Sequence, residues 1–542
     1  MKTLRLTELD TARAAEILKS GGLVGIPTET VYGLGANGLD PDAVSRIFQA
    51  KGRPQDNPLI LHIPCADWLE RYCQNVPPQA YTLAEAFWPG PLTMILKRKS
   101  TVPDIVTAGL DTVGMRCPDH KVCRDIIEQA DVPVAAPSGN ISGRPSPTTA
   151  QHMLDDMDGK IDAVVNGGAC TVGVESTIVD LTCNPPRLLR PGGITVEQLE
   201  QVLCAVEIDS AVRRKMNENE KPRAPGMKYR HYAPKAPVTV VKGAAHETAE
   251  YITKHAQQGN GVICFDEFAQ MFCGCCVKTI GKANDPAEQA RHVFDALRFF
   301  DNTDVCQIWA QCPDEQGVGL AVANRLNKAA GFQIVNLTTM VIGITGPTGA
   351  GKTTALNALK ELGGHVVDCD AVYHDLLINN NAMRAELLER YGEGVFAANG
   401  ALDRKALGAI VFEDPKALAD LNSITHKYVG EAVDEAIERA RLAGVPAIAI
   451  DAIALFESGI AGRCHCTVAV TAPDEIRIKR IMLREGISEE YARLRVSAQK
   501  KEEWFKENCT YVLVNDCTDA AEFQEHASTF FRKVINKQEE LS

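Results

Sequence analysis

MVIGITGPTGAGKTTALNAL, residues 340–359, joins an apolar β-type run to a helical pattern through a glycine-rich turn. Gly346 to Thr353 fits the pattern G-x-x-x-x-G-K-[ST], in the strand-to-helix context where that pattern binds nucleotide phosphates. The N–H groups of the turn and the helix N-terminus favour an anion. The stretch predicts an α/β domain with a parallel sheet flanked by helices and a nucleotide site.

The residues of this loop have separate predicted roles. Lys352 is expected to reach the β- and γ-phosphates, and the Thr353 hydroxyl to bind magnesium, which accompanies ATP as the expected cofactor. The predicted nucleotide contacts are Gly346, Gly349, Ala350, Gly351, Lys352, Thr353 and Thr354.

A second strand-like run, HVVDCDAVYHDLL, ends in Asp368 and Asp370. A carboxylate at the end of a strand beside the loop can accept the proton of an attacking hydroxyl or hold a magnesium-bound water. The alternative is that both aspartates only cap a turn or a helix.

Three more motifs follow: GALDRKAL (400–407), ITH (424–426) and an arginine-rich helical pattern at 474–499. With the loop and the two aspartates, they make residues 341–535 resemble dephospho-coenzyme A kinase. The resemblance implies transfer of the γ-phosphoryl group of ATP to the ribose 3'-hydroxyl of dephospho-CoA. It implies Asp370 as catalytic base and Arg480 and Arg484 as lid residues that stabilise the transferring group; a solvated helix face is the alternative for these arginines.

Two departures from that family's pattern fall in the expected acceptor pocket. Its His-Pro pair is His426-Lys427 here, and Ile453 stands where it has a second proline. We expect the loss of a turn proline and of a rigid one to shift the pocket slightly, beside Arg404, which is expected to help hold the acceptor. Two alternatives to a dephospho-CoA kinase are open: a kinase for another nucleotide-like acceptor, and a non-catalytic domain that only senses nucleotide.

The first 200 residues contain six other motifs: IPTETVYGLGA (26–36), KGRPQDNPLILHI (51–63), FWPGPLTMIL (87–96), GLDTVGMRCPDH (109–120), APSGNISGRPSPT (136–148) and GVESTIVD (173–180). Their basic residues lie in or beside apolar segments fixed by glycine and proline, which suits the binding of phosphate and carboxylate groups in a cavity. Hydroxyl and amide groups beside them suit a small polar ligand. No paired Cys-His nucleophile is visible, so covalent catalysis is not expected.

These motifs make residues 8–205 resemble the YrdC/Sua5 family of threonylcarbamoyl-AMP synthases. The resemblance implies formation of L-threonylcarbamoyladenylate from L-threonine, bicarbonate and ATP, for N6-threonylcarbamoylation of adenosine 37 in tRNA. It places threonine at Thr30, His62, Arg116, Ser138 and Ser176. It places ATP at Arg53, Asn57, Thr112, Asn140, Thr148, Arg190 and Tyr232, with Lys51 in the catalytic set. For His62, a satisfied core imidazole is the alternative.

The expected domains are a YrdC-like domain at 1–206, a linker or lid at 207–236, a small α/β domain resembling the Sua5 carboxy-terminal domain at 237–337, and the kinase domain at 340–542. Within the linker, PGMKYRHYAP (225–234) resembles the segment that crosses the cavity mouth in longer Sua5 members, with His231 or Tyr232 on the nucleotide. In the third domain we expect strands at 238–243, 259–268 and 305–312 and a helix at 288–301. We expect Cys273, Cys275 and Cys276 to be buried or incidental rather than zinc ligands.

The charge balance limits the possible partners. The 57 Lys and Arg against 70 Asp and Glu give a net charge of -13, so no global basic field is present to hold nucleic acid. We therefore expect tRNA to be modified by a separate transferase complex. The 18 scattered cysteines predict reduced thiols. With no signal peptide and no membrane-length apolar run visible, the chain is expected to be cytoplasmic.

Overall fold

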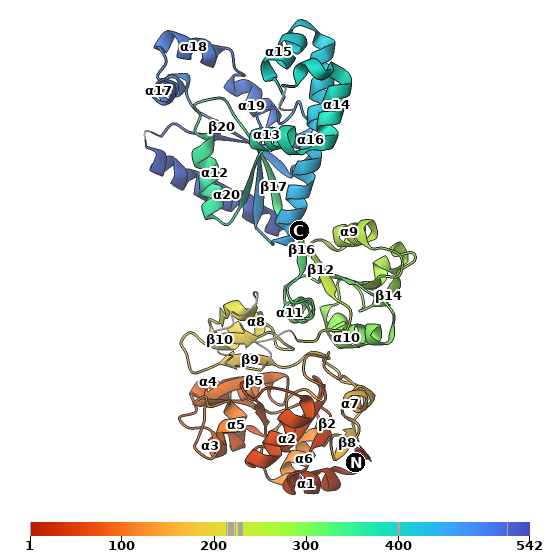
Figure 1. Ribbon diagram of the computed structural model, residues 1–542. Helices are drawn as coiled ribbons and strands as arrows, with labels where there is room; N and C mark the ends of the chain where they lie inside the picture. Colours follow the sequence, from red (N-terminus) through yellow and green to blue (C-terminus); the bar gives the residue numbers. More distant parts are fainter. Residues whose placement is uncertain are drawn as a thin grey trace. The chain divides into compact units, whose positions relative to one another are not determined.

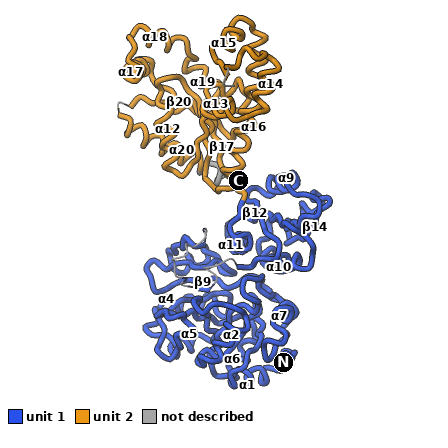
Figure 2. The backbone as a smooth tube through the Cα atoms, in the orientation of Figure 1, with its two compact units in different colours: residues 1–334 blue, residues 335–542 orange. Residues whose placement is uncertain are grey.

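The computed structural model describes residues 2–212, 214, 222, 224–225, 231–397, 402–517 and 519–541. The chain forms two compact units, residues 1–334 and 335–542, which Figure 2 distinguishes by colour. All the cysteines are free thiols. Among the described residues, no helix has the length and apolar character needed to cross a membrane.

The amino-terminal part of unit 1 is built on an 11-stranded mixed sheet with the order β1-β8-β2-β3-β7-β4-β6-β5-β9-β10-β11. Its strands are β1 (Leu4–Thr7), β2 (Val24–Ile26), β3 (Gly33–Asn37), β4 (Ile60–His62), β5 (Leu92–Lys97), β6 (Thr112–Arg116), β7 (Val134–Ala135), β8 (Ala163–Asn166), β9 (Thr177–Asp180), β10 (Arg187–Arg190) and β11 (Glu207–Ile208). Its helices are α1 (Thr11–Lys19), α2 (Pro41–Lys51), α3 (Leu69–Tyr72), α4 (Pro78–Phe87), α5 (Asp104–Thr107), α6 (Lys121–Ala130), α7 (Ala150–Met157) and α8 (Val196–Leu203).

The register of three neighbouring strands brings residues of separate sequence motifs together. β4 and β6 are parallel, with His62 opposite Arg116, and β5 runs antiparallel to β6 with Thr93 opposite Arg116. Because directly opposite residues on adjacent strands lie within about 5.5 Å at Cα, three motifs distant in sequence meet at one point of the sheet.

Helix α2 fixes the position of the basic K-x-R pair. The Asp40 side chain caps it by accepting from the N–H groups of Asp42 and Ala43, and the helix ends at Gly52, whose φ of 62° is left-handed. A glycine adopts that conformation without strain. The Lys51 side chain therefore extends from the last turn of α2, and Arg53 follows directly after the glycine that ends the helix.

The rest of unit 1 is a small α/β domain. Its sheet has the order β14-β13-β15-β12-β16. The elements are β12 (Val238–Lys242), α9 (Ala245–His255), β13 (Gly261–Cys264), β14 (Cys276–Thr279), α10 (Pro286–Phe299), β15 (Ile308–Gln311), α11 (Gly319–Ala329) and β16 (Ile334–Asn336). The three strands and the helix expected from the sequence are confirmed. Every residue of α11 is buried.

The segment expected as a linker begins differently. Glu207 and Ile208 form β11, which pairs in parallel with β10 and extends the large sheet. Ala211 and Val212 are buried just after it. The polar composition of this segment did not predict that its first residues are buried, because the apolar residues that contact them come from distant strands.

Unit 2 has a parallel five-stranded sheet with the order β18-β19-β17-β20-β21. The strands are β17 (Met340–Thr345), β18 (His365–Asp368), β19 (Ala447–Asp451), β20 (Cys466–Thr471) and β21 (Tyr511–Val514). The helices are α12 (Lys352–Glu361), α13 (Cys369–Asn379), α14 (Asn381–Tyr391), α15 (Arg404–Glu413), α16 (Pro415–Leu442), α17 (Asp474–Glu485), α18 (Glu489–Ser497), α19 (Glu502–Asn508) and α20 (Ala520–Leu541).

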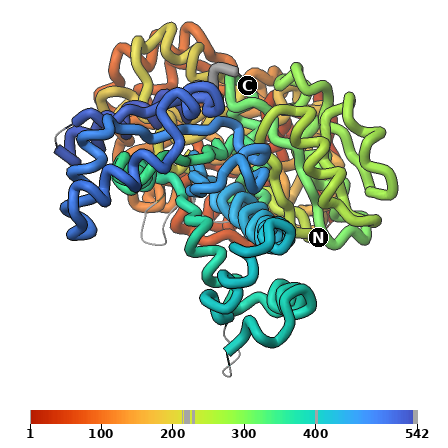
Figure 3. The backbone as a smooth tube through the Cα atoms, turned by 90° about the horizontal axis from the view of Figure 1, so that it is seen from above, coloured from red at the N-terminus to blue at the C-terminus, as the bar shows by residue number. Residues whose placement is uncertain are grey.

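Alternating apolar residues of these strands supply two cores. Ile342 and Ile344 of β17 pack with α12 and α20, whereas Val341 packs with α16 on the opposite face. This is the period of two expected for a strand buried on both faces. Helices α14 and α15 have small apolar clusters of their own and project from the sheet, as the teal segment of Figure 3 shows.

His426 and Lys427, where the family's pattern has a turn proline, are part of a long helix (Figure 1). Helix α16 runs without a break from Pro415 to Leu442, and the pair lies in its interior. Lysine has the backbone N–H that proline lacks, so it continues the helix. The Lys427 ammonium lies 2.7 Å from the Glu386 carboxylate of α14.

Candidate active sites

One cavity in unit 1 gathers most of the residues predicted for the synthase. It measures about 740 Å³, counting its open mouth. All five residues expected to bind threonine line it: Thr30, His62, Arg116, Ser138 and Ser176. It is also lined by Lys51, Arg53, Asn140, Arg190, His231 and Tyr232.

Arg116 forms the charged floor of this cavity. Its guanidinium donates to the Thr30 hydroxyl at 2.9 Å and pairs with the Glu29 carboxylate at 2.8 Å. Arg116 and Glu29 are 4% and 5% exposed, so the pair is strongly shielded from water. Sequence reasoning did not single out Glu29, although it is adjacent to Thr30 in the first motif.

His62 is buried at the end of β4 and lines the same cavity. Burial, aided by the charge of Arg116, lowers its pKa to about 3. The imidazole is therefore neutral near pH 7, and it can offer a hydrogen bond but no positive charge.

Ser176 and Arg190 form a second buried group. The Arg190 guanidinium donates to the Ser176 carbonyl at 3.0 Å and to its hydroxyl at 3.1 Å, and that hydroxyl lies 2.8 Å from the Thr93 hydroxyl. Burial lowers the pKa of Arg190 to about 10, so it is still a cation near neutral pH. A fixed guanidinium of this kind suits a phosphate.

Lys51 and Arg53 hold the loops around the cavity. The Lys51 ammonium donates to the carbonyls of Ser138 and Asn140, and Arg53 donates to the Asn57 carbonyl at 3.1 Å. Burial, and then the neighbouring Arg53, place the pKa of Lys51 well below its usual range. Both cations thus organise the polypeptide that surrounds the ligand space.

Three residues predicted to bind ATP lie outside the cavity lining. Asn57 is buried beside Arg53, Thr112 begins β6 four residues before Arg116, and the Thr148 hydroxyl lies 3.3 Å from His152 Nδ1. Their contact with the nucleotide stays a prediction.

The small α/β domain reaches the cavity wall indirectly, because Arg325 of α11 binds Glu175, which lines the cavity. Its guanidinium, fully buried, binds the Glu175 carboxylate at 2.9 Å and the Pro191 carbonyl at 2.6 Å. Burial raises the pKa of Glu175, but Arg325, Arg190 and Ser146 more than offset this and lower it to about 2. Sequence reasoning did not single out Arg325 or Glu175. A pattern that could have indicated Arg325 is an arginine within a helix whose other residues are mostly small or apolar.

Tyr232 lines the cavity as a buried aromatic residue. It is 5% exposed, has a φ of 63°, and its ring centroid lies 5.1 Å from that of Phe294 in α10. Burial, with a smaller effect of Glu175, raises its pKa to about 12. Of the segment 225–234 expected to cross the mouth, residues 226–230 lie outside the described residues.

In unit 2 the phosphate loop connects β17 to α12. Gly346, Gly349 and Gly351 all have positive φ, and Gly351 caps the helix at φ 100°. A Cβ on Gly351 would lie 2.2 Å from Asn515 Nδ2, so Asn515 would have to move from its hydrogen bond with the Ala350 carbonyl to admit a side chain. The turn therefore presents its N–H groups at the start of α12, as an anion site requires.

Three aspartates and Lys352 meet at the carboxyl ends of β18 and β19. Asp368 and Asp451 are opposite each other on β18 and β19, and the Lys352 ammonium lies 2.5 Å from the Asp451 carboxylate. Burial raises the pKa of Asp451 despite this pairing. Sequence reasoning did not assign Asp451 a role, although it ends the apolar run AIAID.

The two aspartates after β18 have different surroundings. The Asp368 carboxylate caps α13 by accepting from the N–H groups of Asp370 and Ala371. No hydrogen bond or ion pair within the described parts of the chain engages the Asp370 carboxylate, which is exposed at the second position of α13. One of the two is thus a cap and the other is available for chemistry.

Arg480 lies against the phosphate loop. It donates to the carbonyls of Gly349 and Ala350 at 3.4 Å each, to Asn515 Oδ1 at 3.1 Å and to the Cys517 carbonyl at 3.0 Å. These contacts give it a bracing position, and its predicted catalytic role stays a prediction.

The other predicted kinase residues are more exposed. Arg484 pairs with Glu485 on the surface of α17, Arg404 lies 2.9 Å from His374 Nδ1, and Ile453 is 69% exposed after β19. Residues 398–401, which include the start of the GALDRKAL motif, lie outside the described part.

Comparison with known families covers nearly the whole chain. A Sua5/YciO/YrdC model, described as telomere recombination, matches residues 16–192; a model of the threonylcarbamoyl-AMP synthase C-terminal domain matches 194–331; and a dephospho-CoA kinase model matches 340–521. The threonylcarbamoyl-AMP synthase of Pyrococcus abyssi is 47% identical over 342 residues, 61% of this chain and 97% of that protein. The dephospho-CoA kinase of Dehalococcoides mccartyi is 35% identical over 177 residues, 33% of this chain and 89% of that protein.

The chain belongs to both families. It is a fusion of a threonylcarbamoyl-AMP synthase with a dephospho-CoA kinase. The crystal structure of P. abyssi Sua5 complexed with L-threonine is 44% identical, with a TM-score of 0.58 over 62% of this chain and 100% of that one. The synthase cavity described above thus lies in the part of the chain that this match covers.

Proposed function

We propose that the chain carries two complete activities, L-threonylcarbamoyladenylate synthesis in unit 1 and phosphorylation of the 3'-hydroxyl of dephospho-CoA in unit 2. The observation that supports this best is that each unit retains an organised site. Five residues expected for threonine line one cavity, and Lys352 of the phosphate loop pairs with Asp451, whose charge also senses Asp370.

In the synthase, Arg116 is suited to bind the threonine carboxylate, while Thr30, Ser138 and Ser176 offer hydrogen bonds to its polar groups. The threonine nitrogen attacks the carbon of bicarbonate, and water leaves as the carbamate forms. A carbamate oxygen then attacks the α-phosphorus of ATP, and the bond to the β-phosphate breaks to release pyrophosphate. Arg53 and Arg190 would offset the charge of the triphosphate.

Exclusion of water is the second requirement, because the product is a mixed anhydride. Tyr232 is the closing residue of the cavity, and its packing on Phe294 attaches the lid segment to the small α/β domain. A site shut in this way would limit hydrolysis of the adenylate.

In the kinase, Asp370 would accept the proton of the 3'-hydroxyl as its oxygen attacks the γ-phosphorus and the bond to the β-phosphate breaks. Lys352 would exchange its Asp451 partner for phosphate oxygens. Thr353, Asp368, Asp370 and Asp451 supply the hard oxygen donors that suit Mg²⁺. Magnesium bound there with ATP would neutralise charge on the phosphates.

The adenylate is expected to pass to a separate tRNA threonylcarbamoyl transferase, since the net charge of -13 offers no broad surface for nucleic acid. Incubation of the pure chain with tRNA, threonine, bicarbonate and ATP should leave the tRNA unmodified. Modified nucleoside in that incubation would contradict this part of the proposal.

One purified sample tests both activities. Threonine- and bicarbonate-dependent pyrophosphate release reports the synthase, and CoA formation from dephospho-CoA reports the kinase. Absence of either product would favour a nucleotide-sensing module in that unit. Because Ile453 departs from the family pattern, adenosine monophosphate and other nucleotides should be compared with dephospho-CoA; faster turnover of one of them would identify a different acceptor.

A further inference from the structure

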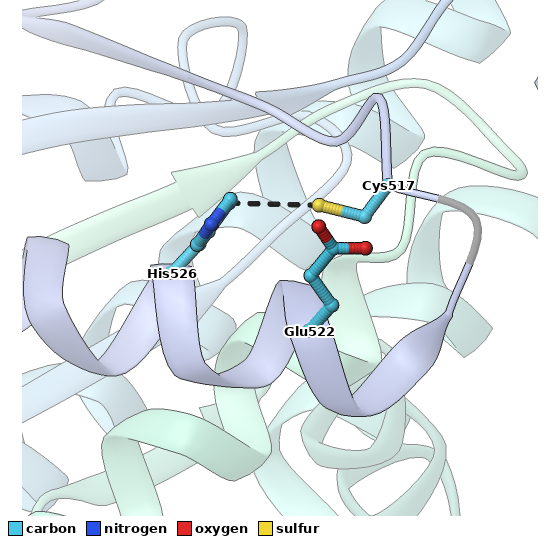
Figure 4. Close-up of side chains that lie close together, drawn as sticks. All are labelled: Cys517, Glu522 and His526. Carbon is cyan, nitrogen blue, oxygen red and sulfur yellow. Dashed lines mark hydrogen bonds between the residues drawn. The ribbon is translucent and has the colours of Figure 1, made fainter.

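A group of metal-binding side chains lies beside the phosphate loop of unit 2 and has no part in the proposed reaction. Cys517 follows β21, and Glu522 and His526 lie one turn apart on α20. One ligand atom from each falls within 4.8 Å of the other two. Figure 4 shows the three side chains converging on one point.

The spacing of the sulfur and nitrogen fits a tetrahedral ion. Cys517 Sγ lies 3.5 Å from His526 Nδ1. A zinc ion about 2.3 Å from sulfur and 2.0 Å from nitrogen separates these atoms by about 3.5 Å when the angle is tetrahedral. The separation of these two ligand atoms therefore matches that around one ion, and the Glu522 carboxylate can complete three protein ligands.

The surroundings hold the backbone of Cys517 in place and leave the other two ligands accessible to solvent. Cys517 is buried, and its carbonyl accepts from Arg480, whereas Glu522 and His526 are exposed. An ion can therefore enter from solvent, with a fourth position left for water. Thiolate and imidazole ligands favour zinc and related transition metals over magnesium or calcium.

We propose that Cys517, Glu522 and His526 form a binding site for a divalent transition metal of the zinc class, separate from the magnesium of the kinase reaction. An ion there would immobilise the chain at Cys517. Arg480 connects that residue to the carbonyls of Gly349 and Ala350, so occupation of the site should also alter the shape of the phosphate loop.

Titration of the full metal-free chain with Co²⁺ tests the site directly. We expect a thiolate-to-cobalt charge-transfer band and the intense visible bands of four-coordinate cobalt, both displaced by one equivalent of Zn²⁺. Cys517→Ser, Glu522→Gln and His526→Gln should each weaken binding at least tenfold. Cys273→Ser and His365→Gln, which change an exposed cysteine and an exposed histidine elsewhere, should leave it unchanged.

Two results would overturn the proposal. One is the absence of the charge-transfer band in the wild-type chain. The other is an unchanged band in His526→Gln. Because His526 is exposed, this variant should fold normally, so its band reports the loss of the imidazole alone. The connection to the loop has its own readout, the affinity for a fluorescent ATP analogue. It should change with Zn²⁺ in the wild type and not in Cys517→Ser, and equal affinities with and without Zn²⁺ would disprove the connection.

Discussion

At the scale of single residues, both sites depend on buried groups whose partners come from distant parts of the chain. Arg116 pairs with Glu29, Arg325 with Glu175, and Asn515 fills the space beside Gly351. Removing one member of a buried ion pair leaves the other charge desolvated and unpaired, at a typical cost of about 3–5 kcal/mol. These positions therefore respond to substitutions that would be silent on the surface.

Gly351→Ala should abolish ATP binding by the kinase. The new Cβ would lie 2.2 Å from Asn515 Nδ2, at a φ of 100° that alanine tolerates poorly. Equilibrium binding of an ATP analogue in the absence of threonine and bicarbonate, together with CoA formation, measures the effect. Gly462→Ala is the matched control, since a Cβ there meets no heavy atom within 4 Å; wild-type affinity in Gly351→Ala would refute the steric argument.

Glu175 should make unit 1 sensitive to acid. Its folded pKa of about 2 lies below the ordinary 4.5, so its stabilisation is fully present above about pH 4.5 and is lost as pH falls through 2. The shift corresponds to roughly 3 kcal/mol. Urea unfolding at pH 7 and at pH 3 should show about 2 kcal/mol of this loss, because pH 3 is still above the folded pKa.

Glu175→Gln should unfold more easily at pH 7 and lose less stability than the wild type between pH 7 and pH 3. Glu200→Gln is the control because that carboxylate is exposed on α8. Equal loss of stability on acidification in the wild type and Glu175→Gln would show that another group controls the transition.

At the scale of elements, the small α/β domain packs against residues that line the synthase cavity. Helix α11 places Arg325 on Glu175, and α10 places Phe294 against Tyr232. One apolar core contains residues of both parts, including Val31, Val174 and Phe294. The two parts of unit 1 therefore pack together beside the site, and Tyr232 belongs to the core that they share.

Tyr232→Ala should uncouple ATP consumption from adenylate formation. Loss of the closing side chain admits water to the anhydride, so AMP should rise relative to intact threonylcarbamoyladenylate by several-fold. Chromatographic quantification of both nucleotides over time checks the ratio. Tyr81→Ala, on a partly exposed tyrosine of α4, is the control; an unchanged AMP ratio in Tyr232→Ala would exclude the closing role.

At the scale of the whole molecule, the two units have separate sheets and separate cores. Ligands that bind a folded unit stabilise it by mass action. The two active sites also share no described residue, which argues for activities that can be lost one at a time.

Lys352→Ala should remove CoA formation and leave threonine-dependent pyrophosphate release within twofold of the wild type. Calorimetry should show that dephospho-CoA raises the midpoint of one unfolding transition and threonine the midpoint of another. Lys360→Ala, a lysine of the last turn of α12, is the control for charge loss. Loss of both activities in Lys352→Ala would contradict independent sites.

Much of this protein follows from the sequence by local rules. The strand, glycine turn and helix at 340–359 predicted the phosphate loop, because a nucleotide cradle of backbone N–H groups is built from consecutive residues. Short apolar runs rich in β-branched residues predicted the strands of the small α/β domain. The motifs of the first 200 residues also identified the side chains that line the synthase cavity, since basic and hydroxyl groups in apolar, glycine-rich segments are typical of such sites.

Tertiary structure decided what local patterns do not encode. Glu29 and Asp451 are ordinary acidic residues in sequence, and only register between strands brings them to Arg116 and Lys352. Arg325 reaches Glu175 across 150 residues of chain. Helix α16 continues through His426 and Lys427, and the replaced proline alone did not predict this long helix. The sequence alone determined the chemical groups and their local backbone, whereas long-range packing determined which charges are paired and buried, because burial and pairing depend on neighbours that are distant along the chain.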